Sequence, residues 1–333
     1  MDYKNILFLI LGLIIGVRLT DIWDYVQLQQ KLSENNNVQC SNNVNNTIDN
    51  NINNVAEYLK NETRVLCWVM TTPQNHLKRA IHVRNTWGSR CSKLLFMSTE
   101  ADPFLETIKL PVQDGREYLW SKTREAFKYI YDNHLDDFDW FLKADDDTYF
   151  IMENLRAFLY TFDAAEPVYF GCKFYPLVEK GYMSGGAGYV LSQEALRRFG
   201  HIGYPNESLC SHNTLSEDKE MGICLHNVGV IAGDSRDAEQ RERFLPLAPI
   251  HLIPIDISEW YAKYLFYRPD LKCCSPDVIS FHYIKPKEFY ILDYFLYELR
   301  AFGVQRAQFD VLPAKVNMTE MMLKWKKNLY KRS

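Results

Sequence analysis

The sequence predicts an α/β fold with a mostly parallel central sheet flanked by helices. Three observations predict it. Short apolar runs recur along the chain from residue 64, segments with helical spacing separate them, and several runs stop at polar or acidic residues. Strands that alternate with helices are typical of a parallel, helix-covered sheet. At 333 residues with 47% hydrophobic content, the chain can bury a large core.

Each element follows from its own pattern. The runs predicted as strands are rich in β-branched and aromatic residues, and the helix 118–133 places Leu119, Thr123, Phe127 and Ile130 on one face. A glycine-rich loop at 181–191 enters a further strand. The predicted strands are 65–70, 93–98, 139–144, 168–172 and 278–283. The predicted helices are 74–86, 118–133, 154–160 and 192–199.

The N-terminal region carries an uninterrupted apolar run over residues 6–17. The run is short for a bilayer span, so a cleaved signal peptide competes with a signal anchor. No small-x-small cleavage site follows, which favours an uncleaved anchor. The next stretch is rich in asparagine and lacks apolar periodicity, which is typical of a flexible stem. The expected division is a cytoplasmic tail 1–5, anchor 6–22, stem 23–63, folded domain 64–312 and basic C-terminal tail 313–333.

Composition and charge restrict the function classes. A net charge of −4 argues against a general nucleic-acid binder, which needs a basic surface. Eight cysteines are too few for a disulfide scaffold but fit an enzyme of an oxidising, luminal compartment. Four Asn-x-Ser/Thr sequons support a luminal location, at Asn45, Asn61, Asn206 and Asn317.

Three consecutive aspartates, Asp145, Asp146 and Asp147, end an apolar strand-like run. Clustered carboxylates repel one another unless a cation neutralises them, and hard oxygen ligands suit Mg²⁺ or Mn²⁺. Ligands of α/β folds bind at the C-terminal edge of the sheet, so we expect a divalent cation beside a diphosphate here. The plain alternative is an acidic turn that leads into a helix.

Two further segments carry titratable groups. Ser216 followed by Glu217 and Asp218 before an apolar run predicts a helix start, and helix capping explains the pattern about as well as chemistry does. The functional alternative is a general base that accepts a proton from a substrate hydroxyl. His282 lies in the alternating run 278–283 and is either an ordinary strand residue or a nitrogen ligand of Mn²⁺.

The glycines at 185, 186 and 188 lack the spacing of a dinucleotide-binding or P-loop fingerprint. They predict either a tight turn before a buried strand or a close approach of backbone to a ligand or a neighbouring strand.

The cysteines favour two local disulfides, although connectivity is not deducible from sequence alone. The candidates are Cys67 with Cys91, Cys210 with Cys224, and Cys273 with Cys274 or with a partner elsewhere. Cys40 in the stem is free to bridge two chains, which leaves a homodimer open.

Together these segments resemble the inverting β1,3-glycosyltransferases of the Golgi, and within that family its core 1 β1,3-galactosyltransferase branch. The similarity covers nearly everything from 64 to about 304, with motifs in matching order. The motifs are RVLCWVMTTPQNH at 64–76, HVRNTW at 82–87, DGREYLWSKT at 114–123, DWFLKADDDTYF at 139–150, GYMSGGAGYVLS at 181–192, AGDSRD at 232–237 and CCSPDVISFHY at 273–283. Cys172 departs from the pattern, because relatives often carry a basic residue there.

The resemblance implies a GT-A fold and a single-pass type II Golgi membrane protein whose catalytic domain, 64–312, is luminal. It also implies Mn²⁺ as cofactor, UDP-galactose as donor and, as acceptor, N-acetylgalactosamine (GalNAc) α-linked to Ser or Thr of glycoproteins. Carried over by motif, Asp145, Asp147 and His282 would bind the metal, and Asp218 would be the catalytic base with Glu217 beside it. The donor-side candidates are Thr71, Arg84, Asp114, Arg116, Lys122, Asp145 and Asp146. The acceptor-side candidates are Gly185, Gly186, Trp260 and Tyr261.

The expected reaction is a single in-line displacement that inverts the anomeric carbon. Asp218 would take the proton from the acceptor's 3-hydroxyl while the metal offsets charge on the departing UDP. Three alternatives stay open: a related β1,3-glycosyltransferase with another donor or acceptor, a non-catalytic chaperone-like relative, and a calcium-binding lectin. The aspartate triplet argues against the chaperone, and its lack of EF-hand spacing argues against the lectin.

Overall fold

The computed structural model describes residues 55–175, 178, 180–212, 216–253, 259–266, 273–302 and 312–330. The expected cytoplasmic tail and signal anchor, together with Cys40 and Asn45, lie outside these residues. Among the described helices, none has the length and apolar character that crossing a bilayer requires.

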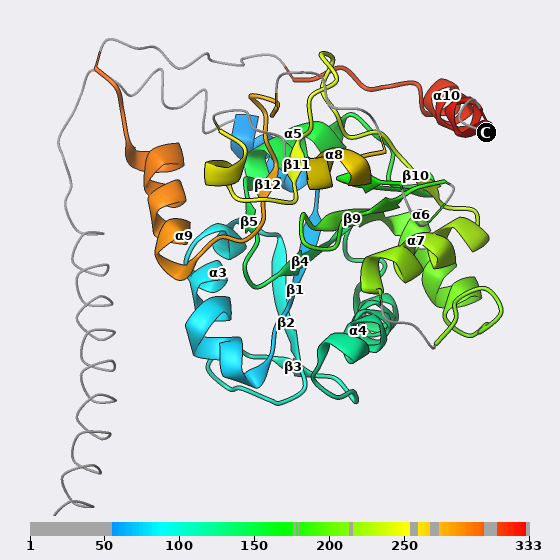
Figure 1. Cartoon of the computed structure of the whole chain (residues 1–333), viewed down its shortest axis with the longest axis horizontal. Helices are drawn as coiled ribbons and strands as arrows, with labels where there is room; N and C mark the ends of the chain where they lie inside the picture. Colours follow the sequence, from blue (N-terminus) through cyan, green and yellow to red (C-terminus); the bar gives the residue numbers. More distant parts are fainter. Residues whose placement is uncertain are drawn as a thin grey trace, which may run out of the picture. The chain divides into compact units, whose positions relative to one another are not determined.

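A seven-stranded sheet, in the order β10-β6-β9-β4-β1-β2-β3, forms the centre of the fold (Figure 1). Its strands are β1 Val65–Met70, β2 Lys93–Ser98, β3 Ile108–Lys109, β4 Trp140–Asp145, β6 Val168–Gly171, β9 Tyr189–Ser192 and β10 Ile231–Ala232. Strand β9 runs antiparallel to β4 and β6, and the other neighbours pair in parallel. The predicted α/β class with a mostly parallel sheet is therefore confirmed.

Both faces of this sheet are covered, so its central strands read as continuous apolar runs. All six residues of β1 are buried. Alternate residues point to one face, where the ring of Trp68 meets that of Phe127 edge-on at 5.1 Å between centroids. Phe127 belongs to α4, which lies with α6 and α7 on the opposite side of the sheet from α3 (Figure 1).

The helices follow the predicted order with one irregular segment. The α-helices are α3 Ile81–Asn85, α4 Leu119–His134, α5 Met152–Tyr160, α6 Gln193–Arg198, α7 Glu217–Asn227, α8 Glu259–Tyr264, α9 Pro286–Asp293 and α10 Met318–Tyr330. The 3₁₀ and π segments are η1 Pro73–Asn75, η2 His76–Ala80, η3 Trp87–Arg90, η4 Arg116–Tyr118, η5 Phe199–Gly203, η6 Pro249–His251 and η7 Tyr294–Glu298. The helical stretch predicted over 74–86 is confirmed, although it is divided into the 3₁₀ segment η1, the π segment η2 and the helix α3. The buried His76 holds this segment through Ser98 Oγ, 2.7 Å from its Nε2.

A small second sheet consists of β11 Phe244–Leu245, β12 Ser280–Phe281 and β5 Tyr149–Phe150. Strand β12 pairs antiparallel with β5, so that Phe281 lies opposite Tyr149. Asp147 lies two residues before β5 and His282 directly after β12, so the antiparallel pairing brings both to the same end of these strands. The strand predicted over 278–283 is too long, since Tyr283 has a φ of 58° and turns the chain. A hairpin of β7 Lys173–Phe174 and β8 Tyr182–Met183 completes the sheets.

The folded unit extends beyond the expected limits 64–312. Residues 55–62, assigned to the flexible stem, form a helix whose Leu59 is buried. The basic tail 313–333 contains α10, whose Trp325 packs against Phe162 and Phe170. Both ends correct the expected boundaries, because each buries an apolar side chain that a stem or tail would leave in water.

Within the described residues, three disulfides join Cys67 to Cys91, Cys210 to Cys224, and Cys273 to Cys274. The candidate pairs are thus confirmed, including the adjacent one. Cys172 is buried and carries a free thiol. The sequon asparagines Asn61, Asn206 and Asn317 are all exposed.

Candidate active site

The carboxyl ends of β1 and β4 lie side by side, with Met70 opposite Asp145. This register brings Thr71, the residue after β1, next to the aspartate triplet, and its hydroxyl donates to Asp146 Oδ2 at 2.8 Å. Asp146 is buried. Burial, together with the two flanking aspartates, raises the pKa of Asp146 to about 6. This carboxyl group therefore faces the interior, beside Thr71.

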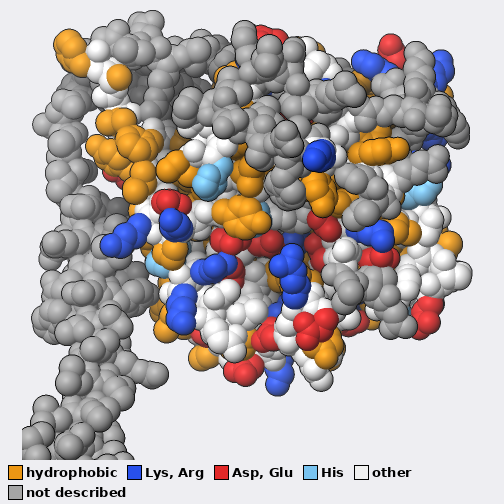
Figure 2. Space-filling model, in the orientation of Figure 1, with side chains coloured by type: hydrophobic (Ala, Val, Ile, Leu, Met, Phe, Trp, Pro, Cys, Tyr) orange, Lys and Arg blue, Asp and Glu red, His pale blue; other side chains and the backbone are white. Residues whose placement is uncertain are grey.

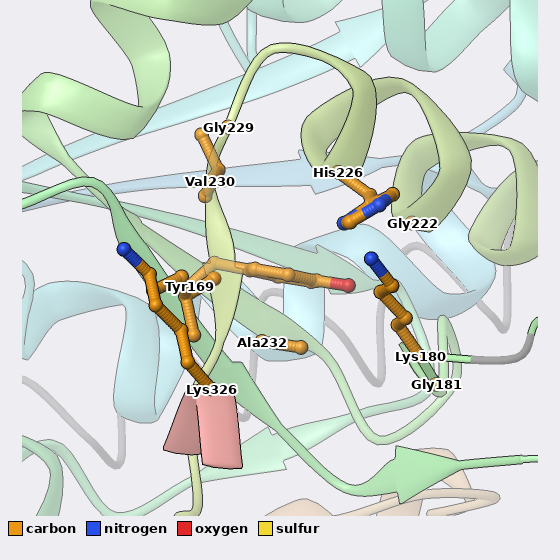
Figure 3. A pocket seen from close by; sticks show the side chains of 10 residues that line it. Tyr169, Lys180, Gly181, Gly222, His226, Gly229, Val230, Ala232 and Lys326 are labelled. Carbon is orange, nitrogen blue, oxygen red and sulfur yellow. The ribbon is translucent and has the colours of Figure 1, made fainter. Parts of the chain in front are cut away.

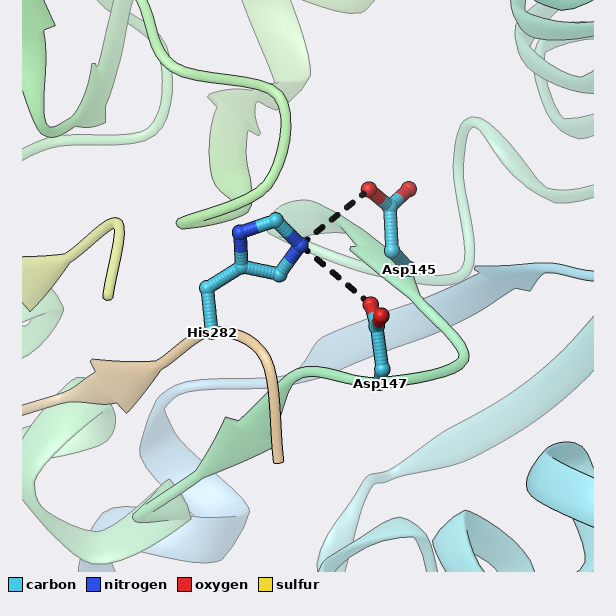
Figure 4. Close-up of side chains that lie close together, drawn as sticks. All are labelled: Asp145, Asp147 and His282. Carbon is cyan, nitrogen blue, oxygen red and sulfur yellow. Dashed lines mark ion pairs between the residues drawn. The ribbon is translucent and has the colours of Figure 1, made fainter. Parts of the chain in front are cut away.

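Asp145 and Asp147 form a cluster with His282 (Figure 4). One ligand atom from each residue lies within 4.8 Å of the others. His282 Nε2 is 3.2 Å from Asp147 Oδ1 and 4.0 Å from Asp145 Oδ2. Two carboxylate oxygens and one imidazole nitrogen form a donor set that suits Mn²⁺ or a related divalent cation.

The backbone fixes the orientation of the imidazole. His282 Nδ1 lies 3.3 Å from the carbonyl oxygen of Pro246, which can only accept, so Nδ1 carries a hydrogen. Nε2 then faces the carboxylates, at a position that a proton or a divalent cation can occupy. Burial opposes ionisation of Asp147, but the contacts with His282 and Arg79 outweigh it and lower the pKa of Asp147. The site therefore presents a carboxylate at neutral pH.

A buried lysine joins this cluster to the acidic pair of α7. Lys143 Nζ donates to Asp145 Oδ1 at 2.6 Å and to the carbonyl of Gly185 at 3.1 Å, and lies 3.8 Å from Glu217 Oε2. Burial by itself lowers the pKa of Lys143, but the Asp145 and Glu217 carboxylates outweigh it and raise the pKa above its usual range. The charged lysine thus fixes both carboxylates relative to each other.

The glycine-rich loop passes between His282 and the acidic pair. A Cβ on Gly186 would lie 2.2 Å from His282 Cε1, and a Cβ on Gly185 would lie 2.7 Å from Glu217 Oε2. Gly188 also closes a turn onto the carbonyl of Gly185 at 3.0 Å. The predicted turn is confirmed, whereas the close approach of Gly185 and Gly186 is to the side chains of Glu217 and His282. A close approach to a ligand stays a prediction.

The two carboxylates at the start of α7 have different environments. Glu217 is buried and accepts from Tyr189 Oη at 2.6 Å and from Thr123 Oγ1 at 3.0 Å. Burial raises the pKa of Glu217. Asp218 is only half-buried, and its Oδ2 accepts from the Gly185 amide at 3.2 Å. The helix begins where predicted, although the Ser216 side chain makes no capping hydrogen bond.

Three donor-side candidates lie together. Lys122 Nζ donates to Asp114 Oδ1 at 2.5 Å and to the carbonyl of Thr71 at 3.0 Å. Asp114 Oδ2 in turn accepts from Thr99 Oγ1 at 2.6 Å. This chain of contacts links the three candidates to Asp146 through Thr71.

Other candidates lie elsewhere. Arg84 is exposed, and its guanidinium contacts the carbonyl and the ring of Phe104 instead of the aspartates. Arg116 is exposed in η4. Tyr261 is 2% exposed and contacts the Cys172 thiol, so it belongs to the interior and not to an open acceptor surface. The side chain of Trp260 lies outside the described residues.

Sequence reasoning missed three contributors to this site. Lys143 had a usable signal, since it stands two residues before Asp145 in the same strand and therefore on the same face. Arg79 donates to Asp147 Oδ2 at 2.9 Å, and Pro246 provides the carbonyl behind His282. Neither has a sequence signal, because irregular backbone brings both to the site. Figure 2 shows acidic side chains gathered across the middle of one face, with lysines and arginines beside them.

A largely parallel sheet with carboxylates and an imidazole at its carboxyl edge defines a class of α/β enzyme that binds a cation and an anionic ligand there. Comparisons with known proteins specify the class further. The Fringe-like family matches residues 60–237. The chain therefore belongs to the Fringe-like family, and it is a glycosyltransferase.

Among the similar proteins is the glycoprotein-N-acetylgalactosamine 3-beta-galactosyltransferase 1 of Xenopus laevis. It is 48% identical over 257 residues, which are 75% of this chain and 71% of that protein. Chondroitin sulfate synthase 3 of Homo sapiens is 31% identical over 180 residues, 48% of this chain and 20% of that protein. Beta-1,3-glucosyltransferase of Mus musculus is 28% identical over 165 residues, 49% of this chain and 33% of that protein.

Proposed function

We propose that the protein transfers galactose from UDP-galactose to the 3-hydroxyl of GalNAc that is α-linked to Ser or Thr of glycoproteins. The observation that carries this proposal is the 48% identity to a galactosyltransferase named for that acceptor sugar. The connected arrangement of Asp147, His282, Lys143 and Asp218 supports it independently. A GT-A type of fold agrees with the mixed, largely parallel sheet.

Mn²⁺ is the proposed cofactor, because the donor set of Asp145, Asp147 and His282 mixes oxygen and nitrogen. When bound, such a cation offsets negative charge on the departing diphosphate. Asp218 is the proposed general base, since its carboxylate is the more accessible of the pair and the Gly185 amide orients it. Glu217 and Lys143 position that region, and the Thr71, Lys122 and Asp114 group lies on the proposed donor side.

Incubating the purified luminal part with UDP-galactose, Mn²⁺ and a GalNAc-peptide tests the proposal. We expect a galactosylated product with a β1,3 linkage, loss of turnover with a chelator, and recovery when Mn²⁺ is restored. A panel of other UDP-sugars and acceptors serves as control, because a related specificity would show as faster transfer from one of them. Absence of transfer from every donor would favour the chaperone-like alternative.

We also propose a single-pass type II protein of the Golgi membrane with a luminal catalytic domain. Three disulfides and three exposed sequons in the described part support an oxidising, glycosylating compartment. Microscopy of the tagged full chain tests this, and a diffuse cytosolic signal would contradict it. Non-reducing electrophoresis of the same chain, compared with Cys40→Ser, tests the disulfide-bridged homodimer.

A further inference from the structure

A pocket of about 250 Å³ lies between α7, strands β6 and β10, and helix α10 (Figure 3). Gly222 and His226 of α7 line it, about one and two turns beyond Asp218. None of the proposed metal ligands lines it. Its volume is small compared with typical ligand pockets of roughly 300–1,000 Å³, so it suits a side chain or a single small group and not a nucleotide.

Tyr169 brings an unsatisfied hydroxyl group into this pocket. The side chain is 2% exposed, and its oxygen makes no hydrogen bond of normal geometry within the described residues. The nearby backbone amide of Met183 can only donate, so the phenolic hydrogen has no acceptor. Burial and the charge of Asp218 raise the pKa of Tyr169, so the hydroxyl remains a donor. A buried hydroxyl of this kind destabilises the folded state until an acceptor reaches it.

The charged side chains among the described residues that line the pocket are positive. Lys180 and Lys326 line the pocket, and none of the described lining residues is acidic. In Figure 3, Tyr169 reaches across the pocket, with His226 and Lys180 beyond its hydroxyl end and Lys326 on the other side. The two ammonium groups can only donate, and the phenolic O–H lacks an acceptor for its hydrogen, so the complementary ligand is an oxyanion.

We propose that this pocket binds a carboxylate or a similar oxyanion carried by the acceptor glycoprotein, close to the residue that receives the sugar. The inference rests on the proposed function. Gly222 and His226 lie about 6 and 12 Å along the helix from Asp218. An extended peptide advances about 3.3–3.6 Å per residue, so an acidic residue about two to four positions from the glycosylated one spans that distance. One acceptor peptide can therefore reach Asp218 with its sugar and the pocket with its acidic residue.

The test uses a set of GalNAc-peptides in which one Glu is moved from about four positions before to about four positions after the modified Thr, each matched with its Gln form. For the wild type we expect one or more positions where Glu lowers KM about two- to fivefold relative to Gln, with kcat unchanged. Added salt should reduce this preference, because it screens the ion pair. Compared with the wild type, the variants Lys180→Gln, Lys326→Gln and Tyr169→Phe should each show a smaller preference for Glu over Gln. Lys324 is an exposed lysine of α10 outside the pocket, so Lys324→Gln should keep the wild-type preference.

Tyr169→Phe separates binding from folding. It removes a hydroxyl that lacks an acceptor, so its thermal unfolding temperature should equal or exceed that of the wild type. A second arm measures the shift in unfolding temperature with inorganic sulfate. Stabilisation by sulfate without any Glu preference would assign a free anion to the pocket and overturn the acceptor assignment.

A Glu preference that survives in all three pocket variants would also overturn the inference. Transfer to the Gln peptides tests the proposed function separately. If no peptide is galactosylated, the proposed function fails; if all are galactosylated equally, only the pocket inference fails.

Discussion

Glu217 and Asp218 are neighbours in sequence, but their surroundings assign them different tasks. Glu217 is held by two hydroxyl groups and faces Lys143, so its position is fixed and it cannot easily reach a substrate. Asp218 is half-buried and orients one oxygen through the Gly185 amide. A general base has to lie within hydrogen-bond reach of the proton it accepts, and the greater exposure of Asp218 agrees with its proposed role as that base.

Asp218→Asn should lower kcat by about 10² to 10⁴, because the amide cannot accept the proton from the acceptor hydroxyl. Binding of UDP with Mn²⁺ should stay close to that of the wild type, since Asn keeps an oxygen for the Gly185 amide. Initial rates and calorimetric titration measure the two effects. Asp136→Asn, on the surface, is the matched control. Turnover within tenfold of the wild type would remove Asp218 from the role of base.

Glu217→Gln should change how stability depends on pH. Burial raises the pKa of Glu217 in the folded state above its ordinary value of 4.5. The folded chain therefore keeps a proton that the unfolded chain has released, and this residue's contribution to stability falls as pH rises from about 4.5 through the raised pKa. The Gln variant should lose that part of the slope.

Chemical denaturation across this pH range checks the prediction, with Glu298→Gln, an exposed carboxylate, as control. Parallel curves for Glu217→Gln and the wild type would show that Lys143 fully offsets burial of the carboxylate.

The residue types of this site could be predicted from the sequence, but only some of the contacts between them could. Acidic residues at a strand end indicate a cation site, and alternation places Asp145 on the same face of β4 as Lys143. His282 is distant in sequence and reaches the aspartates only through the pairing of β12 with β5. Arg79 and the Pro246 carbonyl arrive through irregular backbone, for which no periodicity exists.

At the scale of elements, the glycine-rich loop separates the Asp145, Asp147 and His282 cluster from the two carboxylates at the start of α7. Consecutive Cα atoms are 3.8 Å apart, and the Glu217 and His282 side chains pack against two consecutive residues of this loop, Gly185 and Gly186. The absence of two Cβ atoms is what permits this spacing.

Gly186→Ala should displace the His282 ring, because the new methyl group would lie 2.2 Å from Cε1. We expect Mn²⁺ affinity to fall about 10- to 100-fold, as for other changes that misplace a metal ligand. Calorimetry of Mn²⁺–UDP binding measures it, with Asp147→Ala as the reference for a lost ligand. An unchanged affinity in a variant that keeps its unfolding temperature would contradict the role given to this glycine.

Elements with strong periodicity were predictable, and those shaped by distant contacts were not. Strands β1 and β2 agree with the expected ranges because buried apolar runs specify them locally. The segment 74–86 has helical composition, yet its buried His76 bonds to Ser98 and Asp102, and the helix is divided into three. Tertiary contacts of this kind override local preference.

In the whole folded unit, the two terminal helices contribute to the stability of the fold. The helix 55–62 and α10 both bury apolar side chains against the body, at Leu59 and Trp325. Lys326, beside Trp325, lines the proposed oxyanion pocket. The same helix, α10, therefore stabilises the fold through Trp325 and lines the pocket through Lys326. The cluster of Asp145, Asp147 and His282, in contrast, lies at the ends of strands β4 and β12.

Trp325→Ala should lower the free energy of unfolding by about 3–5 kcal/mol, because it leaves a cavity beside Phe162 and Phe170. Denaturant titration measures the loss, and Leu323→Ala, on the exposed side of α10, should change it by less than about 0.5 kcal/mol. If α10 detaches before the sheet unfolds, hydrogen exchange in 318–330 should rise first, and the preference for acidic acceptors should fall while transfer to a neutral acceptor continues. Simultaneous loss of both activities would show that α10 supports the catalytic edge itself.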